Sequence, residues 1–262
     1  MAIITLTSDW GDSDYYLAAV KGIIYRQMPD AHIVDITHKI PAFQIAQAAY
    51  VLKNAYPNFP DGSVHILAVN TEESIAEPHT VAYFNKQYFI GTDNGFFSLL
   101  FEGQSPEKMI ELDILQETEC FTFSSRDRFV KAAVHLAGGG ALEELGKAKT
   151  ELVERLPLKP VRDKTSIRGV IVYVDNYQNL VTNISKTMFT DLVKKHSFEI
   201  LLRGDSVARV SQSYGDVSPG LLVALFSSED MLEIAINQGT AASLLGIGVD
   251  DAVIVEIKEE QK

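Results

Sequence analysis

The chain has 262 residues, of which 46% are hydrophobic, so it is long enough to build one large domain or two smaller ones around a packed core. Its 35 Asp and Glu residues outnumber its 23 Lys and Arg residues, and the resulting net charge of -12 disfavours binding to nucleic acid and to anionic membranes. No apolar run approaches the ~20 residues of a membrane span, and no histidine has a second His or Cys at zinc-ligand spacing, so neither a membrane segment nor a metal site is predicted.

A single cysteine, Cys120, rules out an internal disulfide and fits a reducing compartment. The first residues, MAIITLTSDWGD, lack the basic segment and apolar core of a secretory signal. We therefore expect a cytoplasmic protein.

Residues 1–155 are predicted to form an α/β domain with a mostly parallel sheet flanked by helices. Strands are expected at 2–9, 32–37 and 63–70, where β-branched and other apolar residues cluster. Helices are expected between them, at 12–29 and 43–56, where apolar residues recur at helical spacing. Asp12 or Ser13 is predicted to cap the first helix.

The rest of this domain contains a hairpin and a helix. Residues 79–95 are predicted as two strands that turn at Asn85 and Lys86, an antiparallel addition to the sheet. A helix is predicted over 126–137, with the glycines at 138–140 ending it rather than binding phosphate.

The composition changes after residue 151. Pro157 and Pro160 lie among charged residues, as in a linker, and strand-like segments dominate the remainder of the chain. We predict a smaller β-barrel-like domain over 164–262, with helices only at 185–195 and 239–246.

Three polar turns follow predicted strands of the first domain, at the edge where open α/β sheets bind ligands. They are TSDWGD, VNTEES and TDNG. Asp9 offers two carboxylate oxygens to a vicinal diol such as a ribose, but an aspartate at this position also suits a helix cap, and spacing alone favours neither. The TDNG stretch is predicted to be a turn with Gly95 at positive φ.

A second polar stretch, VDNYQNLVTNIS, places Asp175 and several asparagines around Tyr177. An asparagine such as Asn179 matches the hydrogen-bonding edge of adenine, and a tyrosine ring offers the base a stacking surface. Turn formation explains the same residues and is the simpler interpretation from the residues alone.

The stretch FTFSSRDR contains two adjacent serines, Ser124 and Ser125. A serine nucleophile needs a base and usually a G-x-S-x-G turn, and neither is visible, since His135 lies about three helical turns away. We interpret one of these serines as the N-cap of the following helix.

Taken together, these stretches resemble the S-adenosyl-L-methionine (SAM) hydroxide adenosyltransferase family, whose members hydrolyse SAM to adenosine and methionine and are related to fluorinases and chlorinases. The resemblance covers nearly the whole chain. It rests on LTSDWGDSDYYLAAVKGII, PDAHIVDITHKIPAFQIAQAAYVL, FPDGSVHILAVN, TDNGFFSLL, TFSSRD and VDNYQNLVTNIS, in this order, with IVDITHKIP the most specific.

The resemblance implies a homotrimer that binds SAM or adenosine between the first domain of one subunit and the second domain of its neighbour, with SAM as substrate or ligand and no cofactor or metal. At the matching positions, Asp9 is expected to hold the ribose hydroxyls and Asp175 the methionine ammonium. Tyr177 and Asn179 are expected to hold the adenine, and Ser125 to contact the ligand.

The family's catalytic positions are substituted in this chain. Where family hydrolases carry aspartate, arginine and histidine, this sequence has Asn70, Glu77 and Ser124. Asparagine does not act as a base, serine lacks imidazole chemistry, and Glu77 reverses a charge, so the usual hydrolytic mechanism is expected to be disabled. Ser125 matches a fluorinase serine, but Asn70 and Glu73 replace the tyrosine and threonine that accompany it there, which argues against halide chemistry.

Three hypotheses remain open at the level of sequence. The first is an enzyme on SAM or a related adenosyl compound that uses an altered polar set, including Glu72 or Glu73. The second is a SAM or adenosine-binding module without catalysis. The third is the family fold with a different ligand.

Overall fold

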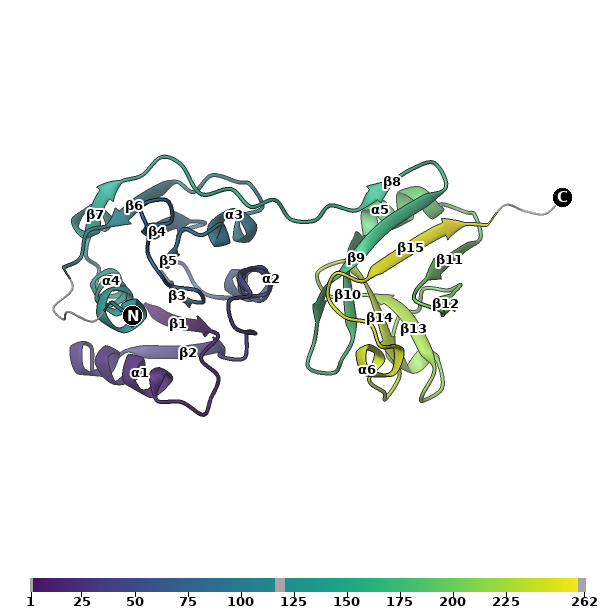
Figure 1. The fold of residues 1–262 in the computed structure, drawn as a ribbon, viewed down its shortest axis with the longest axis horizontal. Coiled ribbons are helices and arrows are strands. Elements are labelled where there is room, and N and C mark those ends of the chain that lie inside the picture. Colours follow the sequence, from purple (N-terminus) through teal and green to yellow (C-terminus); the bar gives the residue numbers. More distant parts are fainter. Residues whose placement is uncertain (1, 116–120, 259–262) are drawn as a thin grey trace. The chain divides into compact units, whose positions relative to one another are not determined.

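The computed structural model describes residues 2–115 and 121–258, and the chain divides into two compact units, Met1–Pro157 and Leu158–Lys262 (Figure 1). Cys120, on which the compartment prediction partly rests, lies outside the described residues. Each unit encloses hydrophobic clusters of its own. Of the helices within the described ranges, none has the length and apolar character needed to cross a membrane.

A seven-stranded sheet forms the centre of the first unit, with the strand order β2-β1-β3-β5-β4-β6-β7. The pairs β1/β2, β1/β3 and β3/β5 are parallel, whereas β4/β5, β4/β6 and β6/β7 are antiparallel. The strands are β1 Ile3–Ser8, β2 His32–Thr37, β3 Val64–Ala68, β4 His79–Phe84, β5 Gln87–Thr92, β6 Lys108–Leu112 and β7 Gly146–Ala148.

The sheet is therefore mixed, and the prediction of a mostly parallel sheet was wrong. Parallel neighbours need a long crossover, which α1 and α2 supply only for the first three strands. The hairpin between β4 and β5 was predicted correctly. Its two turn residues, Asn85 and Lys86, both have positive φ (49° and 61°), as a tight two-residue hairpin turn requires.

Helices cover both faces of this sheet, which makes three layers (Figure 1). Residues of α1 and α4 pack with Ile4 and Ile66 on one face, and residues of α2 and α3 pack with Leu67 on the other, because successive side chains of a strand point to opposite faces. The helices are α1 Tyr16–Gln27, α2 Ile45–Ala55, α3 Phe96–Leu100 and α4 Val130–Ala137, with short helical turns η1 Tyr56–Asn58, η2 Ser125–Phe129 and η3 Leu142–Leu145.

The end of α4 and the start of α1 test two predictions about how these helices are capped. The glycines after α4 end the helix as predicted: the N–H of Gly139 donates to Leu136 O and that of Gly140 to His135 O, both at 2.9 Å, the paired bonds of a Schellman motif. The predicted cap of α1 was wrong. Tyr15 occupies the N-cap position without a capping side chain, while Asp12 pairs with Lys39 at 3.1 Å instead.

The second unit is an antiparallel sheet in the order β12-β11-β15-β9-β10-β14-β13, with β8 paired to β9. Its two end strands contact each other and Val210 bridges to Ala224, so the sheet curls into the predicted near-barrel shape. The two predicted helices are present as α5 and α6. The elements are β8 Val161–Arg162, β9 Ser166–Val174, β10 Leu180–Ser185, α5 Lys186–Val193, β11 Phe198–Leu201, β12 Ser206–Val207, η4 Tyr214–Asp216, β13 Leu222–Phe226, β14 Met231–Ile236, α6 Ala241–Leu245 and β15 Ala252–Ile257.

Candidate functional site

The parallel strands β1, β3 and β5 end at one edge of the first unit's sheet, since neighbouring parallel strands share their direction. The turns that begin after Ser8, Ala68 and Thr92 therefore lie at this edge. One of these turns has a structural role. Asp93 is fully buried, and both of its carboxylate oxygens accept from the backbone N–H of Val153, each at 3.1 Å. Gly95 follows it at φ 93°, which confirms the predicted turn.

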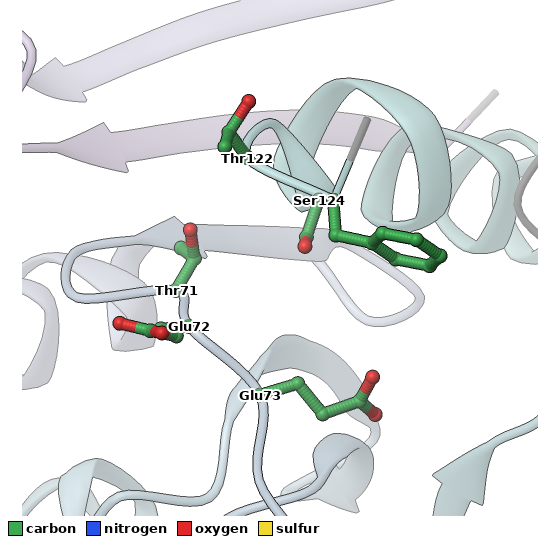
Figure 2. A pocket seen from close by; sticks show the side chains of 6 residues that line it. Thr71, Glu72, Glu73, Thr122 and Ser124 are labelled. Atoms are coloured by element: carbon green, nitrogen blue, oxygen red, sulfur yellow. The ribbon is translucent and has the colours of Figure 1, made fainter. Parts of the chain in front are cut away.

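A pocket of about 540 Å³ lies beside the turn that follows β3 (Figure 2). Two carboxylates, three hydroxyls and one aromatic ring line it. In Figure 2 the Ser124 side chain points from the start of its helical segment toward the loop that carries the two glutamates. The lining residues are Thr71, Glu72, Glu73, Phe121, Thr122 and Ser124.

Of the three substituted family positions, Ser124 is the one among the described lining residues of this pocket. Asn70 precedes the lining residue Thr71 in the sequence and has a left-handed backbone conformation (φ 49°). Its carbonyl accepts from Asn94 Nδ2 at 3.0 Å. Glu77 closes a tight turn by two backbone hydrogen bonds with Ser74. The sequence left open which glutamates face the pocket, and the structure assigns Glu72 and Glu73 to its lining.

The serine pair begins a widened helical turn. Ser124 and Ser125 are both buried, and the π-helical segment η2 Ser125–Phe129 follows directly. Ser124 occupies the N-cap position, as predicted, but its side chain makes no capping hydrogen bond. The carbonyl of Phe123 instead accepts from both Arg126 N and Asp127 N at 3.1 Å. Such π turns occur frequently at functional sites.

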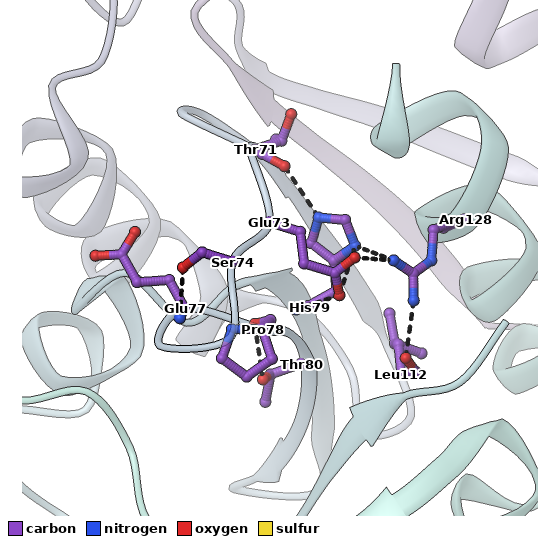
Figure 3. A network of polar contacts seen from close by, with 9 residues as sticks. All are labelled: Thr71, Glu73, Ser74, Glu77, Pro78, His79, Thr80, Leu112 and Arg128. Carbon is purple, nitrogen blue, oxygen red and sulfur yellow. Dashed lines mark hydrogen bonds and ion pairs between the residues drawn. The ribbon is translucent and has the colours of Figure 1, made fainter. Parts of the chain in front are cut away.

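Behind the pocket lies a polar network that the sequence did not reveal (Figure 3). Arg128 Nη1 donates to Glu73 Oε2 in a short ion pair and to His79 Nδ1 at 2.9 Å, and its Nη2 donates to Leu112 O at 2.8 Å. The backbone N–H of His79 donates to Glu73 Oε1 at 3.3 Å. Both carboxylate oxygens of Glu73 are therefore held.

The contacts of His79 define its protonation state. Its Nε2 lies 2.9 Å from Thr71 O, which can only accept, so Nε2 carries the hydrogen. Its Nδ1 faces the Arg128 guanidinium, which can only donate, so Nδ1 is bare and the ring is neutral. Burial lowers the pKa of His79, which agrees with this assignment.

Asp9 lies in a turn that is tied down from two sides. Its Oδ2 accepts from Phe43 N at 3.0 Å, and the carbonyl of His38 accepts from Gly11 N at 2.7 Å. The ring of His38 bonds Ser8 Oγ through Nδ1 at 2.7 Å and faces Asp35 through Nε2 at 3.1 Å. Since α1 begins at Tyr16, the helix-cap interpretation of Asp9 was wrong.

The IVDITHKIP stretch thus contributes Asp35 and His38 to the support of the Asp9 turn. Ser8, His38 and Asp35 have the residue types of a hydrolase triad, but Ser8 is fully buried. A nucleophile must reach its substrate, so we assign this set a structural role.

The predicted ligand residues of the second unit lie in the β9–β10 loop. Asp175 Oδ1 accepts from Asn179 N at 2.8 Å and its Oδ2 from Asn179 Nδ2 at 3.0 Å. Tyr177 is 75% exposed. The roles of these three residues toward a ligand stay predictions.

Two further polar residues near this loop were missed. Tyr214 donates its hydroxyl to Glu233 Oε1 at 2.6 Å, and burial raises the pKa of Glu233, with Asp175 adding repulsion. The signal for Glu233 was a charged residue within the alternating apolar strand MLEIAI.

Across residues 2–115 and 121–258, no group of three or more His, Cys, Asp or Glu side chains is arranged to hold a metal ion.

Comparison with known proteins gives the family. Residues 4–146 match the SAM hydroxide adenosyltransferase N-terminal domain, and residues 169–254 match the C-terminal domain of the same family. The chain is 30% identical over 259 residues to an (R)-S-adenosyl-L-methionine hydrolase of Thermus thermophilus, covering 94% of this chain and 96% of that protein. It is 25% identical to a fluorinase of Nocardia brasiliensis, covering 92% of each.

A solved structure shares the fold of this chain. The crystal structure of an uncharacterized conserved protein from Thermotoga maritima superposes with a TM-score of 0.89 at 28% identity, over 97% of this chain and 99% of that one. With both domain matches in order along the chain, this protein belongs to the SAM hydroxide adenosyltransferase family.

Proposed function

We propose that this protein binds SAM and cleaves it to adenosine and methionine by a modified mechanism in the pocket beside β3. The observation that carries the proposal is the Glu73 carboxylate, which lies on the pocket wall, fixed at both oxygens, together with the Ser124 and Thr71 side chains. The relatives named as SAM hydrolases support the substrate. SAM carries a sulfonium cation, which the carboxylate of Glu72 complements, since that of Glu73 is already paired with Arg128.

The proposed chemistry needs no acid for the leaving group. A water oxygen attacks C5′, the C5′–S bond breaks, and its electron pair stays on sulfur, so methionine leaves as a neutral thioether. Glu73 accepts the proton that the water loses and passes it to solvent, which balances the reaction as SAM plus water to adenosine, methionine and a proton. No cofactor or metal takes part in this proposal. The carboxylate of Glu72 also disfavours a halide nucleophile by charge repulsion.

The proposed ligand contacts follow the family resemblance. Asp9 holds the ribose hydroxyls and Ser125 lies beside the ligand, while Asp175 binds the methionine ammonium and Tyr177 with Asn179 binds the adenine. We propose a homotrimer in which the first domain of one subunit and the second domain of its neighbour complete each site. A cytoplasmic location, which rests on the single cysteine, is likewise a proposal.

The test is to incubate the purified protein with SAM and to quantify adenosine, methionine and protein-bound nucleoside by mass spectrometry. Asp9→Ala should abolish binding because it removes both ribose acceptors. Glu73→Gln should keep binding and slow turnover, since an amide oxygen is a poor proton acceptor. Unchanged turnover in Glu73→Gln would rule out this carboxylate as the base, and unchanged affinity in Asp9→Ala would rule out adenosyl binding at this edge.

A second function is favoured by one observation, the substitution of the family's catalytic positions by Asn70, Glu77 and Ser124. Under this alternative the protein is a SAM or adenosine-binding module. The same assay separates the two: SAM or adenosine retained on the protein without free methionine identifies the binding module.

A further inference from the structure

Of the two carboxylates that line the pocket, Glu73 is the one with both oxygens held by hydrogen bonds among the described residues. Its side chain is 37% exposed, so it is open to the pocket on one side. Its other side rests on two elements distant in the sequence: Arg128 on η2 holds Oε2, and the backbone of His79 at the start of β4 holds Oε1. A carboxylate fixed in this way keeps one orientation toward whatever occupies the pocket.

Arg128 is held through both terminal nitrogens of its guanidinium, while its buried Nε has no hydrogen-bond partner among the described residues. Its side chain is only 12% exposed, and its Nη2 is fixed by the carbonyl of Leu112 on β6. Because the guanidinium is largely shielded from water, its ion pair with the partly exposed Glu73 is screened less than a pair between two exposed side chains.

His79 joins this pair to the pocket wall. The ring is 1% exposed, packs edge-on against Phe129 at 4.8 Å, and accepts from Arg128 while it donates to the carbonyl of Thr71. Since the ring is neutral, its Nδ1 does not form an ion pair with Glu73 at 3.6 Å; it serves to aim the guanidinium. One continuous network therefore runs from Thr71 through His79 and Arg128 to Glu73.

We propose that Arg128 and His79 are the positioning residues of this pocket, which hold the Glu73 carboxylate ready to accept the proton of the attacking water. This inference rests on the proposed function for the reaction, but the geometric claim is independent of it. Neither residue contacts the reacting atoms in this proposal; both act through Glu73.

The first test is kinetic. Arg128→Met should lower kcat for SAM cleavage by about tenfold or more, because a misdirected base loses its alignment, and should leave KM within about twofold, since ground-state binding is untouched. Arg128→Lys, or guanidinium added to Arg128→Ala, should restore part of kcat. Lys108→Met is the matched control. Lys108 lies on β6, the strand whose Leu112 carbonyl holds Arg128, and the substitution removes the cation of an exposed ion pair with Glu143.

The network also predicts coupling between its members. His79→Phe keeps the aromatic packing on Phe129 but loses both ring hydrogen bonds, so it should lower kcat in the same direction as Arg128→Met. The double variant should fall by much less than the product of the two single effects, because both act through one carboxylate. Independent, multiplying effects would overturn the proposed chain of contacts.

A readout without turnover separates this inference from the proposed function. In a crystal structure of Arg128→Met, the Glu73 carboxylate should leave the pocket wall or occupy several conformers, while it stays in place in Lys108→Met. An unmoved Glu73, or an unchanged kcat, overturns the inference. If the wild-type protein makes no adenosine while Glu73 moves in Arg128→Met, the positioning claim stands and only the proposed hydrolysis fails.

Discussion

At the scale of single residues, the buried histidines show how strongly the core sets protonation. His65 is fully buried, and its contacts define one tautomer: Nε2 donates to Gln87 Oε1 at 2.6 Å and Nδ1 accepts from Thr5 Oγ1 at 2.7 Å. Burial lowers the pKa of His65 to about 4. The neutral ring is thus part of the folded state.

A pH dependence of stability follows from His65. Its folded pKa lies below the unfolded value of 6.5, so its stabilisation is complete above pH 6.5 and is lost as the pH falls toward 4. The loss should approach about 3 kcal/mol for this residue, with His79 acting in the same direction. Urea unfolding between pH 7 and 4 measures it: His65→Gln should flatten the curve, whereas exposed His196→Gln should leave it unchanged. A wild-type stability that rises on acidification would contradict the assignment.

At the scale of elements, the sequence predicted those helices, strands and turns that are set by neighbouring residues. The βαβ units, the hairpin at Asn85 and the glycine-ended α4 each carry their signal within a few residues. The hairpin was predicted as an antiparallel addition to the sheet, but β7 has three residues and β6 lacks a clear alternation, so these two further antiparallel strands were not predicted. The Arg128–Glu73 pair joins positions 55 residues apart, and only the folded sheet and helix bring them together.

The segment after β7 offers a test of an element held by a buried charge. Asp93 is fully buried, accepts from Val153 N, and pairs with Lys149 at 3.2 Å. Lys149→Met would leave that carboxylate without its cation and should cost about 3 kcal/mol of unfolding free energy, together with faster hydrogen exchange at the Val153 amide. Lys147→Met is the control. Lys147 lies on β7 and forms an exposed ion pair with Asp113, so its substitution should change neither the unfolding free energy nor the hydrogen exchange of Val153. Equal losses in both variants would show that burial of Asp93 is not the cause.

At the scale of the whole molecule, the proposed ligand residues are divided between the two units: Asp9 belongs to Met1–Pro157, and Asn179 to Leu158–Lys262. Both units also carry large apolar side chains that are exposed in the single chain. These include Phe43 and Ile75 in the first unit and Tyr177 and Leu244 in the second. The composition of a site from two subunits is therefore a question that a mixing experiment answers directly.

Asp9→Ala and Asn179→Ala should each abolish SAM binding alone. If each site takes its first domain from one subunit of a closed ring and its second from the neighbour, co-expression of the two variants in equal amounts should restore about a quarter of the sites, the chance that two intact domains meet. Light scattering on the same sample should give a mass three times that of the 28.9 kDa chain. Calorimetry counts the sites without requiring turnover. No restored binding in a confirmed trimer would mean that one chain supplies both residues, and the proposed site between subunits would be wrong.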